Sequence, residues 1–534
     1  MPALPFSHSR TQFTYAFNQQ GASDTVNILA TPLAVPGPKP DLLWGNWKQL
    51  KKDRIRVMEQ WIQCYGKVFG IYLGDKPFMV ITDVELVKEC FVKTTKAFQD
   101  RPMWAQRLCP LRRGLFGEHP TPPKRRANWR ASSAYWVGCQ TNSNDGALKS
   151  FEVIFREADS ALFESAFAYP GLYSILQRLY PFTSFSKALQ KVMDDALITL
   201  NKRRSGEEGR KEDVLQHVID AQEGVGNVLP TASANVRFID DHILVCNLAI
   251  LILAGYDTTS ASLAFLLYLL AKHPEEQLKI RAEIVSALRH KENSDRQAFA
   301  ETERTATNFD AKQDLEREGW QPSHNVPDLS PPHATNDVVS EAVSSVHEAL
   351  HDIYGQRADV PQASSNAETG ENELDEDDVM QLQRLDMVVR EGLRLYPPIP
   401  INVMRECTED TTILCQFIPA GTSVLAPPWH IHRNEEMWPE PDRFVPERFA
   451  PEHRDNVASS YYPFGLGPRT CVAHRLAMVT LKTALYRLVR NFDISLAEDL
   501  PDPLPIWVHN VVLNPKVAIK LTVTRSNIKQ IQRQ

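Results

Sequence analysis

The pattern of hydrophobic and polar positions divides the chain into a few strand-like and many helix-like stretches. Residues 68–73 and 78–81 are short β-type runs separated by the turn sequence GDKP, which predicts a hairpin. The sequence TDVE follows and places Thr82 and Glu85 at the spacing of a capping box, which predicts the start of a helix. Further along, the stretch SKALQKVMDDALITLNKR is one of several amphipathic helix patterns between residues 150 and 220.

The strongest helical pattern covers residues 240–271 and is apolar on nearly every face. Such a helix belongs either in the core of a large protein or in a membrane, and this one is long enough to span a bilayer. However, Asn247 and a polar cluster at 257–262 would then lie near the bilayer centre, where polar groups are costly. The pattern therefore favours a buried core helix over a membrane span.

Two segments lack a pattern that could form a core. Residues 1–34 are polar, contain no long apolar run, and are interpreted as a flexible leader without an obvious membrane anchor. Residues 291–377 are rich in Ser, Asn, Asp, Glu and Pro, and we interpret them as a mostly disordered insertion in a single folded unit over 35–534. The amphipathic stretch 337–354 is either a docking helix within that insertion or part of a solvated loop.

The C-terminal third has compact patterns again. The sequence DDVMQLQRLDMVVREGLRLY predicts one helix that ends at Pro397 and Pro398, since proline cannot continue a helix. Short strands and turns follow, then a helix after Cys471. The final pattern VVLNPKVAIKLTV predicts a hairpin.

Composition and charge narrow the class of protein. The chain has 534 residues, of which 43% are hydrophobic, so a large core is available. Its formal net charge of -7 argues against nucleic acid as the main partner, because phosphate binding needs a basic excess. The eight cysteines contain no CxxC pair, which favours reduced intracellular thiols over a disulfide framework.

Cys471 stands out because it follows a Gly/Pro-rich turn and precedes an apolar-periodic helix. A cysteine in this position is an inert core thiol, a nucleophile or a metal ligand. Gly465 and Gly467 permit unusual backbone conformations, and the helix N-terminus, with Arg469 and His474 nearby, would stabilise a thiolate. A thiolate on a glycine-lined loop suits an axial ligand of haem iron.

The sequence AGYDTT at 254–259 adds a second polar element inside the long helix. Gly255 leaves room for a flat group to approach. Thr258 and Thr259 can bond back to a carbonyl and open a local bulge. The acid Asp257 next to the alcohol of Thr258 can relay protons, which cleavage of an O–O bond requires. The alternative is a polar kink without a catalytic role.

Taken together, these motifs resemble the cytochrome P-450 family. The sequence FGLGPRTC matches the haem-binding pattern Phe-x-x-Gly-x-Arg-x-Cys, with Ala473 at the small position that is usually Gly. The resemblance implies haem b with Cys471 as the iron ligand, Phe464 beside it, Gly467 in the turn and Arg469 at a haem propionate. It implies a mainly α fold, with a large helical domain, a small β-rich domain and haem between them.

The resemblance extends to other positions and is closest to the microsomal branch that includes drug-oxidising enzymes and thromboxane synthase. It implies a buried structural network of Glu391, Arg394 and Arg448, from EGLR and FVPERF. It implies that Arg405 contacts a propionate and that Asp257 and Thr258 deliver protons. Pocket candidates by analogy are apolar: Ile399, Ile401, Val403 and Val508.

Three features depart from the family pattern. The usual N-terminal membrane helix is missing, the 291–377 insertion replaces a short connection, and the segment after Gly117 is too short for a haem-contacting helix. In that segment Trp129, Arg125, Arg126 and Arg130 are candidate substitutes at a different spacing. A degenerate, inactive family member is therefore one alternative.

The favoured function is insertion of one oxygen atom from O2 into a hydrophobic organic substrate, in secondary metabolism or in xenobiotic or lipid oxidation. Electrons would come from NADPH–cytochrome P-450 reductase, because the chain has no GxGxxG fingerprint after a strand. A reductant-free isomerase is the other alternative, although the acid–alcohol pair favours a monooxygenase. The resemblance implies a location on the cytosolic face of the endoplasmic reticulum membrane. Because no anchor helix is found in the sequence, peripheral membrane association or a cytoplasmic location is also allowed.

Overall fold

The computed structural model describes most of the chain in several ranges. These are residues 35–41, 44–74, 76–100, 150, 153–154, 179–207, 215–216, 219–220, 241–310, 373–453, 457, 459–509 and 511–526. The helical elements are α1 (Trp47–Lys52), α2 (Arg54–Tyr65), α3 (Val84–Lys88), the π-helix η1 (Glu89–Lys93), η4 (Tyr180–Phe182), α8 (Ser184–Ser205), α11 (Asp241–Lys272), α12 (Pro274–Asp310), α14 (Glu376–Gln381), α15 (Gln383–Leu395), α16 (Pro428–Ile431), η5 (Pro446–Phe449), η6 (Pro451–His453), η7 (Gly467–Arg469) and α18 (His474–Asn491). The strands are β1 (Val68–Leu73), β2 (Lys76–Ile81), β3 (Val403–Glu406), β4 (Thr411–Ile413), β5 (Gln416–Ile418), β6 (Ser423–Ala426), β7 (Phe492–Leu496), β8 (Ile506–His509), β9 (Val512–Pro515) and β10 (Leu521–Arg525).

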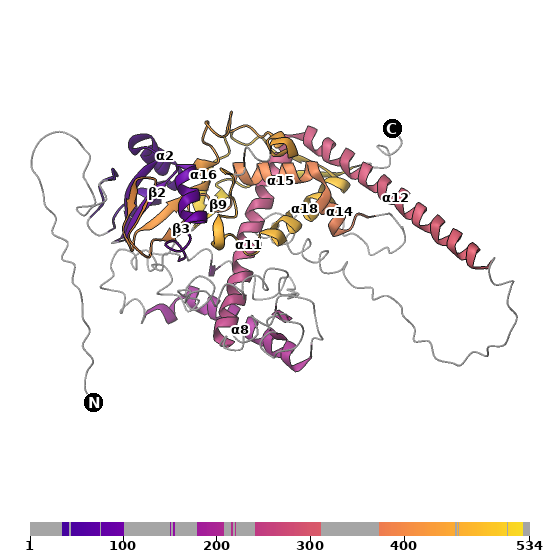
Figure 1. The fold of residues 1–534 in the computed structure, drawn as a ribbon, viewed down its shortest axis with the longest axis horizontal. Coiled ribbons are helices and arrows are strands. Elements are labelled where there is room, and N and C mark those ends of the chain that lie inside the picture. The colour runs from indigo at the N-terminus through magenta and orange to yellow at the C-terminus, as the bar shows by residue number, and fades with distance from the viewer. Residues whose placement is uncertain are drawn as a thin grey trace, which may run out of the picture.

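A four-stranded sheet in the order β1-β2-β6-β3 lies at one end of the molecule (Figure 1). The predicted hairpin is confirmed, since β1 and β2 pair antiparallel, with Val68 opposite Ile81. Alternate residues of β2 enter two different core clusters: Phe78 joins one that includes α2, and Met79 joins one that includes α3 and η1. Because successive side chains of a strand point to opposite faces, these two clusters cover both faces of the sheet.

The helix after β2 begins one residue later than the capping-box spacing predicts. Its N-cap is Asp83, whose carboxylate accepts a hydrogen bond from the Leu86 N–H at 2.9 Å. Thr82 is not the cap, because its hydroxyl lies 3.3 Å from the carbonyl oxygen of Lys67, to which it donates. Two cap-forming residues stand side by side, and the contact with Lys67 decides between them.

The helical part of the molecule is built around α11 (Figure 1). Its N-terminal half packs against α8, and its C-terminal half forms the largest core cluster with α12, α15 and α18. In the part of the chain that the structure describes, Leu244–Lys272 is the one helix long and apolar enough to cross a membrane. Every leucine from Leu263 to Leu270 is nevertheless buried by other helices, which agrees with the interpretation as a core helix. A Cβ on Gly392 of α15 would lie 2.4 Å from Leu266, so glycine allows α15 to approach α11 closely.

The predicted helix over DDVMQLQRLDMVVREGLRLY is wrong in one respect, because it is split at Leu382 into α14 and α15. Leu382 has an extended ψ of 108°. Lys482 of α18 donates to a carbonyl at the end of α14 at 2.7 Å. The Glu283 carboxylate of α12 accepts from the N–H groups of Arg384 and Leu385 at 2.8 and 3.3 Å. Both new helix ends are thus capped by side chains from other helices.

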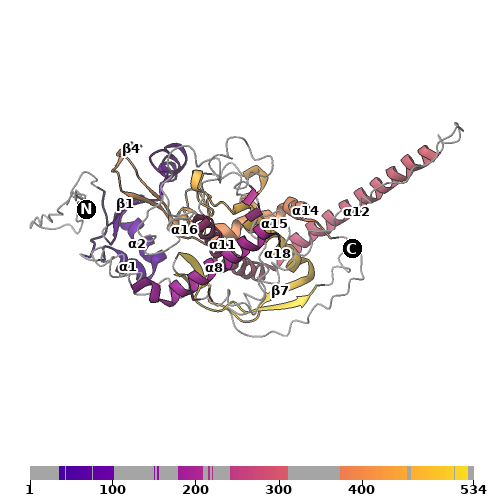
Figure 2. The same cartoon turned by 90° about the horizontal axis from the view of Figure 1, so that it is seen from below.

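Part of the predicted insertion is helical. The helix α12 continues to Asp310, so residues 291–310 belong to it, and it projects away from the body of the molecule (Figures 1 and 2). The chain is described again from Glu373. Lys291 Nζ contacts the carboxylates of Asp375 and Asp378 at 2.8 and 2.5 Å, which joins the two flanks of the segment. The amphipathic stretch 337–354 lies outside the described residues.

The predicted C-terminal hairpin is also wrong. The strand β9 pairs with the preceding strand β8, with Val512 opposite His509, whereas β10 pairs with β7, with Leu521 opposite Leu496. The chain passes from one sheet to another between the end of β9 at Pro515 and the start of β10 at Leu521. Two separate two-stranded sheets therefore replace one hairpin.

Candidate active site

The loop before α18 folds back on itself and ends at Cys471. The Gly465 N–H donates to the Tyr462 carbonyl at 3.0 Å, and the Cys471 N–H donates to the Phe464 carbonyl at 2.8 Å. Gly465 and Gly467 have φ angles of 78° and 70°, in the left-handed region that glycine tolerates best. Cys471 is partly exposed and lies just before Ala473, the N-cap of α18. The predicted position of the thiol near a helix N-terminus agrees with this geometry.

The loop is seated directly on η1 and on the residues that follow it. A Cβ on Gly467 would lie 1.8 Å from the Phe91 carbonyl oxygen, so only glycine fits there without movement. Arg469 Nε donates to the Gln99 carbonyl at 2.8 Å and lies 3.8 Å from the Asp100 carboxylate. Desolvation by burial lowers the pKa of Arg469, and the nearby Asp100 carboxylate acts in the opposite direction.

Arg405 of β3 approaches the same loop from the sheet. It is buried, and it donates to the Leu466 carbonyl at 2.8 Å and to the Met404 carbonyl at 2.7 Å. Its guanidinium lies over the Phe91 ring, 4.9 Å from the ring centroid. Arg405, which was singled out from a different stretch of sequence, therefore meets the loop that contains Gly467 and Arg469.

Phe464 links this loop to the helical core. Its side chain packs against the cluster formed by α11, α12, α15 and α18, and its ring centroid lies 6.2 Å from that of His474. His474 Nδ1 in turn lies 3.1 Å from the Cys471 carbonyl oxygen. The loop is thus held between the sheet on one side and the large helices on the other.

The central part of α11 differs from the rest of this helix. Ala254 is exposed and residues 255–259 are partly exposed, whereas every residue from Ser260 to Leu270 is buried. Thr258 Oγ1 donates to the Ala254 carbonyl at 2.7 Å, and Ser262 Oγ donates to the Thr258 carbonyl at 2.7 Å. The predicted bulge is wrong, because α11 is an α-helix from Asp241 to Lys272. The hydroxyl groups share carbonyls with the helix without displacing its hydrogen bonds.

The match to known proteins decides the family. The family model described as cytochrome P450 matches residues 35–130, 136–303 and 358–523. The chain belongs to the cytochrome P450 family. Relatives include cytochrome P450 3A6 of Oryctolagus cuniculus, 27% identical over 93% of this chain and 93% of that protein. Cytochrome P450 3A29 of Sus scrofa is 26% identical over 91% of this chain and 90% of its own length, and cytochrome P450 3A7 of Homo sapiens is 26% identical over the same shares.

The predicted family, mainly α cytochrome P450 fold, enzyme class and cofactor are therefore confirmed. The protein is a cytochrome P450 monooxygenase, and proteins of this family bind haem b through a cysteine thiolate. As members of this family do, it uses an organic substrate, O2 and a redox partner. The residues around the loop fit such a group: a partly exposed thiol ends the loop, and two guanidinium groups flank it. Residues 304–357 lie outside the family match and within the predicted insertion.

The predicted network of this cytochrome P450 is present and buried. Arg394 contacts both carboxylate oxygens of Glu391, at 2.7 and 2.9 Å, and neither side chain is exposed. Arg448 Nε lies 3.5 Å from the same carboxylate, which also accepts from the Val445 N–H at 2.9 Å. Burial raises the pKa of the Glu391 carboxyl, and the hydrogen bonds from Arg394 and Val445 act in the opposite direction.

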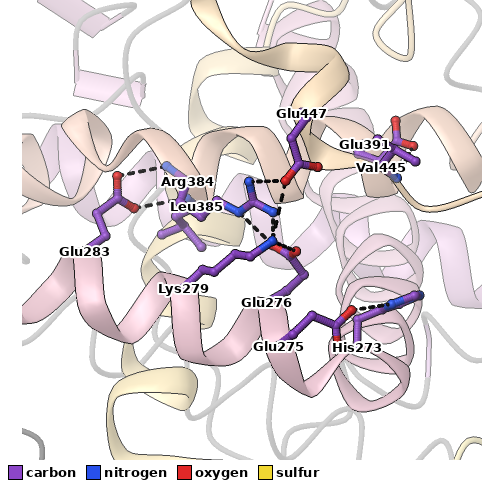
Figure 3. Close-up of polar contacts among 10 residues, drawn as sticks. All are labelled: His273, Glu275, Glu276, Lys279, Glu283, Arg384, Leu385, Glu391, Val445 and Glu447. Atoms are coloured by element: carbon purple, nitrogen blue, oxygen red, sulfur yellow. Dashed lines mark hydrogen bonds and ion pairs between the residues drawn. The ribbon is translucent and has the colours of Figure 1, made fainter.

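A second charge cluster, which sequence reasoning missed, lies beside the first (Figure 3). Arg384 of α15 contacts the nearly buried Glu276 of α12, and it reaches Glu447 of η5 at 2.9 Å. Lys279 also contacts Glu276, at 2.8 Å. Because Glu447 immediately precedes Arg448, this cluster holds the same turn that supplies Arg448 to Glu391. Apart from Glu276 and Lys279, which are three residues apart, the partners lie far apart in the sequence, so no local spacing indicates the whole cluster.

The remaining candidates are less close to the loop or lie elsewhere. Ile401 is buried in a cluster with α2 and β1, Val403 is partly buried beside the loop, and Val508 packs at the edge of two clusters. Ile399 is partly buried. The four candidates Trp129, Arg125, Arg126 and Arg130 lie outside the described residues.

Proposed function

We propose that Cys471 provides the thiolate that binds haem iron, and that this cytochrome P450 inserts one oxygen atom into a hydrophobic organic substrate. The observation that carries the proposal is the loop itself. Cys471 ends a turn in which Gly467 packs against η1 and Arg469 donates to the Gln99 carbonyl, and both of these residues belong to the family motif. When bound, haem supplies the binding of dioxygen and the cleavage of its O–O bond.

The role of the loop residues follows from their contacts. Phe464 anchors the loop in the helical core, and Gly467 lets it lie against η1. Arg469 and Arg405 hold neighbouring backbone carbonyls in place and carry positive charge, which suits the carboxylates of haem. Ala473 occupies the N-cap position of α18 without a bulky side chain.

Asp257 and Thr258 are proposed to handle protons. Thr258 commits its hydroxyl hydrogen to the Ala254 carbonyl, so the lone pairs of Oγ1 remain to accept a hydrogen bond. Asp257 is partly exposed on the same turn and can exchange a proton with water. An acid and an acceptor side by side can therefore hold and pass a proton at these oxygens.

The substrate class is proposed from the surface of α11. Its partly exposed stretch presents Ala254 one turn before the acid–alcohol pair, and Leu251 one turn earlier on the same side of the helix. An apolar surface beside the reacting groups favours a hydrophobic substrate. Steroids, fatty acids, terpenoids and polyketides share this property. We therefore propose that the reaction belongs to secondary metabolism or to xenobiotic or lipid oxidation.

The electron donor proposed is NADPH–cytochrome P-450 reductase, on the cytosolic face of the endoplasmic reticulum. The similarity to the 3A proteins of several vertebrates supports this choice. Oxidation of NADPH that requires the added reductase would support it, whereas product formation without any reductant would favour the isomerase alternative.

The ligand is tested by a carbon monoxide difference spectrum of the reduced protein. Wild type is expected to show the red-shifted Soret band of thiolate-bound haem, and Cys471→Ser and Cys471→His are expected to lose it. Cys64→Ser is the matched control, since Cys64 is an exposed cysteine of α2. A thiolate-type band that survives in Cys471→Ser refutes the ligand, and absence of haem from wild type refutes the function.

Proton handling is tested in the holoenzyme with reductase and a panel of one steroid, one fatty acid and one terpenoid. Thr258→Ala and Asp257→Asn are expected to lower product formed per NADPH about 10²-fold, a typical loss for a proton-transfer group. Ser262→Ala is the control, because Ser262 makes the same kind of bond within the buried part of α11. Equal yields in all four proteins would refute the assignment.

A further inference from the structure

His432 is a fully buried histidine at the end of α16, and both of its ring nitrogens have backbone partners. Its Nε2 lies 3.0 Å from the Tyr462 nitrogen, and its Nδ1 lies 3.3 Å from the Arg394 carbonyl oxygen. A backbone N–H can only donate and a carbonyl can only accept. The contacts therefore assign one tautomer, with the hydrogen on Nδ1 and a lone pair on Nε2.

The ring of His432 is fixed by aromatic neighbours as well as by hydrogen bonds. It stacks on Tyr461 at 5.6 Å between centroids, and Tyr462 and Trp438 meet it in edge contacts at 5.4 and 6.5 Å. Its own carbonyl accepts from Arg394 at 2.8 Å. Burial lowers the pKa of His432 to about 3, so the ring stays neutral and keeps the acceptor on Nε2 near neutral pH.

The partner of Nε2 is the first residue of the cysteine loop. The Tyr462 N–H is held by His432, and the Tyr462 carbonyl accepts from Gly465 in the first turn of the loop. On the other side, Arg394 is held by the buried Glu391. His432 thus lies between the end of α15 and the start of the loop that ends at Cys471.

We propose that His432 is a positioning residue of this cytochrome P450: by accepting from the Tyr462 N–H, it fixes the start of the loop that presents Cys471. This proposal rests on the proposed role of Cys471 as the iron ligand. His432 acts through the backbone of Tyr462 and does not itself take part in the reaction. Loss of its acceptor leaves a buried N–H without a partner, which favours displacement of the loop.

Three substitutions separate the two ring contacts. His432→Gln can place an amide oxygen near the position of Nε2, His432→Asn can retain only the donor near Nδ1, and His432→Leu retains neither. Each full-length variant is examined by carbon monoxide difference spectroscopy, by haem content and by far-UV circular dichroism. We expect Gln to keep the thiolate-type Soret band, and Asn and Leu to lower the ratio of this band to the shorter-wavelength band about tenfold.

The controls keep the outcome interpretable if a variant fails to fold. In the wild-type protein, ¹⁵N-labelled histidine is expected to show His432 with its hydrogen on Nδ1, and the opposite tautomer would overturn the proposal. Hydrogen exchange of peptides covering 459–471 is expected to rise in His432→Asn but not in His432→Gln. Wild-type-like spectra and exchange in Asn, or Gln that behaves like Leu, would also overturn it. If wild type itself shows no thiolate-type band, the function fails, and the exchange data still decide the role of His432.

Discussion

Substituting Gly467 by alanine tests how strictly the cysteine loop depends on its close contact with η1. The new Cβ would lie 1.8 Å from the Phe91 carbonyl oxygen, whereas ordinary contact starts at 3.4 Å. The loop and η1 would then have to separate by roughly 1.6 Å, because the Cβ and the carbonyl oxygen are both fixed to the backbone and cannot rotate away. Forced overpacking of this kind costs about 1–3 kcal/mol, and the left-handed backbone costs a non-glycine residue about 1–2 kcal/mol more.

The chain offers two matched controls for the backbone cost alone. Gly465 lies in the same loop at a φ of 78°, and the nearest atom to its Cβ is 3.9 Å away. Gly421 has a φ of 80° in the turn before β6, with nothing within 4 Å. Alanine at either position is expected to cost about 1–2 kcal/mol, so the three variants share the conformational cost and only Gly467→Ala adds the clash.

The assay is the urea dependence of haem retention, followed by the thiolate-type Soret band at equilibrium. Gly467→Ala is expected to destabilise the bound state by about 2–5 kcal/mol in total and to lose the thiolate-type band first. Gly421→Ala is expected to keep the band. If the destabilisation of the haem-bound state by Gly467→Ala and by Gly465→Ala differs by less than about 0.5 kcal/mol, the contact with Phe91 does not constrain the loop and the reasoning is refuted.

Two further predictions concern stability. Arg384→Gln is expected to lower the free energy of unfolding by about 2–4 kcal/mol, because it leaves the buried Glu276 with Lys279 alone. The control Arg443→Gln breaks only an exposed ion pair and is expected to cost less than about 1 kcal/mol. Equal urea midpoints for the two variants would contradict this prediction. Burial lowers the pKa of His430 to about 4 and of His432 to about 3, from 6.5. Since the unfolded chain binds these protons first, stability is fully present above pH 6.5 and falls as pH decreases, by about 2 kcal/mol per histidine at pH 5. Urea unfolding at pH 7.5 and 5 measures this, and a slope unchanged in His430→Gln would contradict it.

Local sequence patterns predict those parts of the molecule whose partners are near in sequence. The β1–β2 hairpin, the core helix α11 and the glycine turn before Cys471 depend on periodicity, turn residues and permissive backbones. The family resemblance adds the network of Glu391, Arg394 and Arg448, which local spacing alone presents as a surface ion pair.

The remaining features depend on contacts that no local pattern contains. The break at Leu382 exists because Glu283 and Lys482 supply caps from other helices. Likewise, His432 has ordinary neighbours in the sequence, and its importance appears only when the Tyr462 N–H and the Arg394 carbonyl reach it. In each case a polar backbone group buried by tertiary packing selects a distant side chain as its partner.

The contact of Lys291 with Asp375 and Asp378 has a consequence for how this chain tolerates changes in length. The two flanks meet in the folded protein, so the distance between these two points of the chain is fixed. The entropy lost on closing a flexible loop grows only with the logarithm of its length, and doubling the length costs about 0.6 kcal/mol. Because this contact holds the two points together, the number of residues between them is expected to have little effect on the stability of the catalytic core.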